Sequence, residues 1–130
     1  MDQPKFAPGF RISMRDILAI VLGAVATASM APVDRWLSLS IAFVTLHFFL
    51  FCNVFRIPRL PELIWAAVFL SLAASAIFFS AITWPLVYLL SAAVTLVLVP
   101  WEMRRPSYHG VGWRLFNPRL PDWWRTSRGG

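Results

Sequence analysis

A single histidine, His47, lies deep inside an apolar run that extends from Trp36 to Phe55. Ionisable groups are rare in runs of this kind because burying them in an apolar medium is costly, and they often mark a functional site. A neutral imidazole can ligate the iron of a haem or the magnesium of a chlorophyll-type pigment, and it can relay protons. The alternative is a packing role, in which the ring hydrogen-bonds to a neighbouring helix or a carbonyl. His47 is therefore the candidate cofactor ligand.

Few other residues have the types and spacing that catalysis or metal binding requires. Asp16, Glu62 and Glu102 fall at expected helix ends beside arginines, where helix capping and ion pairing are the favoured roles. The single cysteine, Cys52, lies in an apolar run, where a small buried side chain is the default interpretation. The sequence contains no G-x-S-x-G, H-E-x-x-H or glycine-rich phosphate loop. We therefore expect no catalytic site, no metal site and no enzymatic activity.

The composition identifies the kind of element that must hold these residues. Of the 130 residues, 58% are hydrophobic and 14% are charged, with a mean hydropathy of +0.65. Soluble domains have about 45–50% apolar and about 25% charged residues. This balance excludes disordered chains, disulfide-rich scaffolds and nearly all soluble folds. It predicts an integral, multi-pass membrane protein.

Four apolar runs predict an all-α protein with four transmembrane helices, because a span needs about 20 apolar residues. A capping-box pattern at Ser13 and Asp16 indicates where the first helix begins. The expected helices cover about 16–32, 36–55, 62–82 and 84–102. Residues 1–15 form an N-terminal tail, and residues 103–130 form an irregular C-terminal tail that ends in a short interfacial turn.

The basic residues predict how this chain is oriented in the membrane. Eleven of the twelve lie in the two tails and the middle loop, and Arg35 alone lies in the other loops. The positive-inside rule therefore places both termini in the cytoplasm, most simply at a bacterial inner membrane. The arginines on that side are expected to contact anionic lipids, and no nucleic-acid partner is expected. A cleaved signal peptide ending near Ala26-Thr27-Ala28 is the alternative for the first run.

Tryptophan and small residues give further expectations for the helices. Trp36 and Trp84 fall at the expected outer ends, and Trp65 and Trp101 fall at the inner ends, where tryptophan is enriched. Small residues at four-residue spacing predict close packing among the first, third and fourth helices. The packing residues chosen are Ala19, Gly23, Thr27, Ala67, Ser71 and Ser75. The second helix instead carries phenylalanines, which are expected to serve as filler, lipid contacts or a docking face: Phe43, Phe48, Phe49, Phe51 and Phe55.

The C-terminal tail concentrates the aromatic and arginine residues that interfaces favour. The candidate partner-binding residues are Tyr108, Trp113, Arg114, Phe116, Arg119, Trp123 and Trp124. Within this tail, Pro118-Arg119-Leu120-Pro121-Asp122 repeats the pattern Pro58-Arg59-Leu60-Pro61-Glu62 that opens the third apolar run. Each copy combines an arginine, a helix-starting proline and an acidic first turn.

These observations favour a non-catalytic subunit or accessory protein of a larger membrane complex, such as a photosynthetic or respiratory assembly. Other membrane subunits are then its expected partners, bound through the aromatic residues of the second helix and the C-terminal tail. A pigment- or haem-binding polypeptide is the first alternative, through His47. A small oligomeric transporter is the second. The chain resembles the small multidrug-resistance family in length and number of spans, but Asp16 lies at the start of its helix, whereas that family has an acidic residue well inside it.

Overall fold

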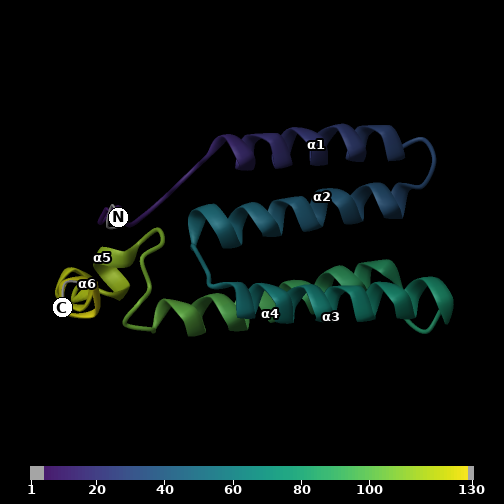
Figure 1. The fold of residues 1–130 in the computed structure, drawn as a ribbon. Helices are drawn as coiled ribbons and strands as arrows, with labels where there is room; N and C mark the ends of the chain where they lie inside the picture. The colour runs from purple at the N-terminus through teal and green to yellow at the C-terminus, as the bar shows by residue number, and fades with distance from the viewer. Residues whose placement is uncertain (1–4, 129–130) are drawn as a thin grey trace.

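The computed structural model describes residues 5–128, and helices are the regular secondary structure found in that range. Two long antiparallel hairpins make up the body of the molecule, and two short helices lie at one end of it (Figure 1). The elements in chain order are α1 (Met14–Met30), α2 (Arg35–Phe49), a π-helical continuation η1 (Leu50–Val54), α3 (Arg59–Phe78), α4 (Trp84–Met103), α5 (Trp113–Phe116) and α6 (Leu120–Arg128).

Three of these helical segments are long and apolar enough to cross a membrane. They are Arg35–Val54, Arg59–Phe78 and Trp84–Met103, each of 20 residues. The prediction of an all-helical chain is therefore confirmed, and three helices long and apolar enough to cross a membrane agree with the prediction of a membrane protein. Helix α1, with 17 residues, is shorter than these three. It lies antiparallel beside α2 along most of its length (Figure 1).

Side-chain caps explain where the first two helices begin. Ser13 and Asp16 form the capping box expected from the sequence: the Ser13 amide donates to the Asp16 carboxylate at 2.7 Å, and the Asp16 amide donates back to Ser13 Oγ. Asp34 caps α2 by accepting hydrogen bonds from the amides of Trp36 and Leu37. Each cap satisfies amide groups that a helix start leaves without an intrahelical partner.

An aromatic core joins α2 and η1 to α3 and α4. Phe51 is only 1% exposed, and its ring meets that of Trp65 edge to face at 5.6 Å. Trp65 stacks on Phe69 at 5.5 Å, and its Nε1–H donates to the carbonyl of Ser91 on α4. Trp65 is thus a core residue. Its indole can be buried because the N–H has a carbonyl acceptor.

The close contact of α1 is with α2, not with α3 or α4 as predicted. A Cβ built on Gly23 would lie 2.5 Å from Thr45 Oγ1, so only glycine fits at this crossing. Four residues further on, the carbonyl of Thr27 accepts a hydrogen bond from Ser38 Oγ at 2.7 Å. Ala19, one turn before Gly23, is half-buried. The small residues of α1 therefore set its separation from α2.

The three small residues of α3 that were predicted to pack do not form its packing face, whereas Ala73 lies in the core. Ala67 and Ser71 are exposed, and Ser75 is only partly covered. The hydroxyls of Ser71 and Ser75 each donate to a carbonyl four residues earlier in the same helix. The expectation for these three positions is corrected: α3 packs through Trp65 and Phe69, whose rings fill the space between the helices better than small side chains would.

Candidate functional site

The N-terminal segment, the α2–α3 linker and the C-terminal tail are folded together at one end of the bundle (Figure 1). Backbone hydrogen bonds join them: the Gly9 amide donates to the His109 carbonyl at 2.7 Å, and the Val111 amide donates to the Val54 carbonyl at 2.8 Å. The Arg11 amide donates to the Asn53 carbonyl at 3.1 Å. We call this unit the end cap; it comprises residues 5–12, 53–58 and 104–128.

The C-terminal part of the end cap is ordered around buried polar groups. The side-chain amide of Asn117 donates to the carbonyl of Pro106 at 2.7 Å and to the carbonyl of Tyr108 at 3.0 Å. The phenol of Tyr108 donates to the Val111 carbonyl at 2.6 Å, and Leu120 is fully buried. The tail, predicted as irregular up to a short final turn, contains two short helices; α6 occupies the position of the expected turn, and residues 104–112 are non-helical. Tyr108, predicted as a partner-binding residue, is buried inside the end cap.

The other predicted interface residues remain at the surface of the end cap or partly covered within it. The Arg114 guanidinium lies 5.6 Å from the centroid of the Trp113 ring, and Trp113 also meets Phe6 edge to face. Phe116 is 54% exposed, and its neighbour Leu115 is 80% exposed. Arg119 is exposed, whereas Trp123 and Trp124 are half-buried. We call Arg114, Leu115 and Phe116 the α5 surface.

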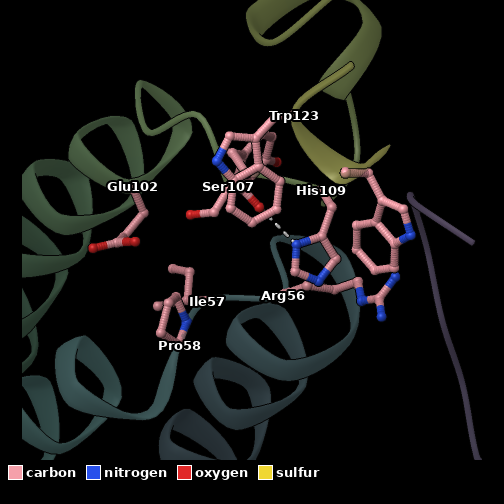
Figure 2. A pocket seen from close by; sticks show the side chains of 9 residues that line it. Arg56, Ile57, Pro58, Glu102, Ser107, His109 and Trp123 are labelled. Carbon is pink, nitrogen blue, oxygen red and sulfur yellow. Dashed lines mark hydrogen bonds between the residues drawn. The ribbon is translucent and has the colours of Figure 1, made fainter. Parts of the chain in front are cut away.

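A small cavity of about 120 Å³ lies inside the end cap. Figure 2 shows Glu102 and His109 on opposite sides of it, with Trp123 above and the linker residues Ile57 and Pro58 below. His109 Nδ1 hydrogen-bonds the Ser107 carbonyl at 2.8 Å. Glu102 is 4% exposed and lies 3.5 Å from Arg105 Nε. The cavity thus lies between the end of α4 and the tail.

A larger pocket of about 550 Å³ lies between the N-terminal segment, Arg56 and the tail. Arg56 follows η1 with a positive φ of 48° and donates from Nη1 to the Ala7 carbonyl at 2.6 Å. The pKa of Arg56 is lowered because burial removes water from its guanidinium and because the charge of Arg11 repels its own. The pocket therefore brings together two cations from segments far apart in sequence.

His47, the candidate cofactor ligand, lies within the aromatic core. Its Nδ1–H donates to the Phe43 carbonyl one turn earlier at 2.9 Å, and the side chain is 6% exposed within the protein. The ring stacks on Trp65 with centroids 4.5 Å apart and planes 15° apart. Both contacts serve packing, and they leave Nε2 as the atom through which the ring could ligate a metal.

The carboxylates of the described residues each have a nearby structural partner. Asp16 and Asp34 cap helices, and Asp122 pairs with Arg125 at 2.6 Å. Glu102 lies next to Arg105, and the Glu62 carboxylate lies 3.9 Å from Cys52 Sγ. Within residues 5–128, no group of three or more histidine, cysteine or acidic side chains is arranged as a metal site.

The phenylalanines of the second apolar run divide between the core and the surface. Phe43 and Phe51 pack against Trp65, so they act as filler between helices. Phe49 and Phe55 are half-buried, and Phe48 is 40% exposed. A docking face formed by all five is therefore excluded by the packing, and Phe48 is the member left at the surface.

Several residues of the end cap were missed in the sequence. Gly110 packs against the backbone of Phe55, so a Cβ at this position would collide with the Phe55 carbonyl. Asn53, 1% exposed, donates from its side chain to the Arg11 carbonyl at 2.6 Å. An asparagine in an apolar run is a usable signal, because a buried amide needs partners.

Comparison with known protein families, curated proteins and solved structures gave no match for this chain.

Proposed function

We propose that this chain is a non-catalytic subunit or accessory protein of a larger membrane complex and that it binds a partner subunit through the α5 surface. The observation that supports this role most directly is the folded end cap. It orders two chain termini through backbone hydrogen bonds and holds Leu115 and Phe116 outward beside Arg114. Exposed aromatic and aliphatic side chains next to an arginine are typical of interaction surfaces.

The topology that goes with this proposal has four spans, with α1 as the fourth. A helix of 17 residues is about 25 Å long and lies at the lower limit for crossing a bilayer. Its contact with α2 at Gly23 supports an orientation parallel to the bilayer normal. The arginine count then places the end cap in the cytoplasm, and we propose a bacterial inner membrane as its location.

The experiment that tests the proposed role is extraction of the tagged chain from its native membrane in a mild detergent, followed by native electrophoresis and mass spectrometry. We expect the chain to migrate with larger subunits in fixed stoichiometry. A Leu115→Asp/Phe116→Asp double variant should release the chain from that complex. The control is Val33→Asp, which introduces an aspartate at an exposed apolar residue of the α1–α2 loop, away from the α5 surface.

Two outcomes would contradict this proposal. A chain that runs only as a homo-oligomer, without other subunits, would remove the accessory role. A complex that survives the double variant at Leu115 and Phe116 would show that the α5 surface is not the docking site. In that second case these residues would be immersed in the headgroup region, where aromatic side chains are also favoured.

A further inference from the structure

The larger pocket of the end cap combines basic and aromatic side chains from three segments. Its basic members are Lys5, Arg11 and Arg56, and its aromatic members are Phe10, His109 and Trp124. The position of Arg11 is fixed through its backbone, which exchanges two hydrogen bonds with Asn53. The position of Arg56 is fixed by the hydrogen bond to the Ala7 carbonyl.

This pocket carries positive charge that the described residues do not neutralise. The two ion pairs within residues 5–128 are Arg105–Glu102 and Arg125–Asp122, and neither includes Arg11 or Arg56. Asp16, which accepts hydrogen bonds from the Ser13 amide and hydroxyl, offsets part of the charge of Arg11, so the three basic side chains of the pocket keep a net positive charge among the described residues. Like charges that the fold holds close together favour the binding of an anion between them.

The pocket lies next to the ends of two apolar helical segments. Arg11 lies three positions before the start of α1 at Met14, and Arg56 lies two positions after the end of η1 at Val54. Both guanidinium groups therefore belong to the boundary where the apolar helices end. Guanidinium groups match the geometry of phosphate oxygens and bind them with two parallel hydrogen bonds.

A separate apolar groove, which shares no lining residue with this pocket, lies along the bundle. It has a volume of about 610 Å³ and runs between α1 and α2, past small side chains such as Ala24 and Ala28 to Phe49. Phe10, which lines the basic pocket, contacts Phe49 with ring centroids 5.9 Å apart. A basic pocket that adjoins an apolar groove has the two-part chemistry of a phospholipid: an anionic headgroup and an acyl chain.

We propose that the basic pocket and the groove together bind one anionic phospholipid. Its phosphodiester lies between Arg11 and Arg56, and one acyl chain lies in the groove between α1 and α2. A soluble phosphate compound would use the same arginines but would leave the groove empty. This site is separate from the α5 surface, so binding can be measured on the purified chain without any partner subunit.

The test is native mass spectrometry of the detergent-purified full-length chain, titrated with phosphatidylglycerol or with phosphatidylcholine of the same acyl composition. We expect phosphatidylglycerol to bind more tightly. Arg11→Gln should weaken its binding about fivefold or more, since one basic residue near an anionic headgroup contributes about that factor. Arg119→Gln, which removes an exposed arginine outside the pocket, is the charge-matched control.

Two further arms test the groove and the lipid source. Ala28→Phe fills the groove and should weaken binding of both lipids, with folding checked by circular dichroism. Sodium phosphate at millimolar concentration should not displace phosphatidylglycerol. The proposal is wrong if Arg119→Gln weakens binding as much as Arg11→Gln, if both lipids bind equally, or if phosphate alone displaces the lipid. An Ala28→Phe variant with unchanged binding would overturn the assignment of the groove.

Discussion

Gly110 of the C-terminal tail rests directly on the backbone of Phe55, at the junction between η1 and the α2–α3 linker. The neighbouring amide of Val111 donates to the carbonyl of Val54, so two consecutive residues join the tail to the end of η1. Because the opposing atoms at Gly110 belong to the main chain, they cannot rotate away as a side chain can. This contact limits how closely the tail of the end cap packs against the end of η1.

We predict that Gly110→Ala loosens the end cap. The added methyl group collides with the Phe55 carbonyl, and overpacking of this kind costs about 1–3 kcal/mol. Limited trypsin digestion in detergent should then cleave faster at Arg114 and Arg119. Val111→Ala, which trims an exposed side chain and keeps the amide, is the control. Equal digestion rates for Gly110→Ala and the native chain would contradict the predicted clash.

A second prediction concerns the crossing of α1 and α2. Gly23→Ala should destabilise this pair because its Cβ would lie 2.5 Å from Thr45 Oγ1. Thr45→Ala removes Oγ1 and Cγ2, so the double variant should recover most of the loss. Thermal unfolding of the four proteins in one detergent gives the coupling free energy, which we expect to be about 1–2 kcal/mol. Additive losses would show that the helices do not cross at these residues.

The third prediction is an alkaline transition in the end cap. Burial raises the pKa of the Tyr108 phenol above its ordinary value of 10.0 because the phenolate is poorly solvated. The folded state therefore binds the proton more tightly than the unfolded state, and this stability is complete below pH 10. It is lost as the pH rises through the raised pKa, where the hydrogen bond to Val111 is also broken.

Tyrosinate absorbance during an alkaline titration measures this transition. The native chain should show a late-titrating tyrosine that is missing in Tyr108→Phe. At neutral pH the same variant should lose about 1 kcal/mol of end-cap stability, since it lacks the hydrogen bond to Val111. A Tyr108 that ionises at its ordinary value would show that its phenol is not buried in the membrane-bound protein.

A fourth prediction tests whether α1 crosses the bilayer. Single cysteines are introduced at Ala7, Val33 and Thr126 in a Cys52→Ser background and are labelled with a membrane-impermeant maleimide in bacterial spheroplasts. If all four long helices span, only Val33→Cys is labelled before lysis. Labelling of both Ala7→Cys and Val33→Cys from outside would mean that α1 does not cross. Labelling of Thr126→Cys from outside would show that the C-terminal tail lies on the side opposite to the one that the arginines predict.

The helices were predictable because their signals are local. Apolar length located every long helix within a few residues, and the Ser13–Asp16 capping box fixed the start of α1. The third helix ends at Phe78, earlier than the expected residue 82, because the chain turns through Ser80 with a positive φ of 49°. Composition could not reveal that turn, since serine, unlike glycine, gives no strong signal for this conformation.

The end cap was not predictable because its contacts join residues far apart in the chain. The backbone hydrogen bond from the Gly9 amide to the His109 carbonyl leaves no periodic pattern in the sequence. Neither of the two segments that it joins indicates by itself that this bond forms. The sequence singled out Tyr108 and Phe116 by residue type alone, yet the fold buries Tyr108 and exposes Phe116. Which aromatic residue faces outward is decided by tertiary contacts, such as those that Asn117 makes inside the tail.

The last prediction separates a packing role for His47 from a ligand role. The ring stacks on Trp65 and donates to the Phe43 carbonyl, so we expect His47→Ala to lower the thermal stability of the bundle by about 2–4 kcal/mol. His47→Phe keeps a ring of similar size against Trp65 and should restore most of that loss. The protein purified in mild detergent should show the same visible absorption for the native chain and both variants. A haem or pigment band present in the native chain and absent from both variants would instead establish His47 as a ligand, because phenylalanine restores the packing but has no nitrogen to bind a metal.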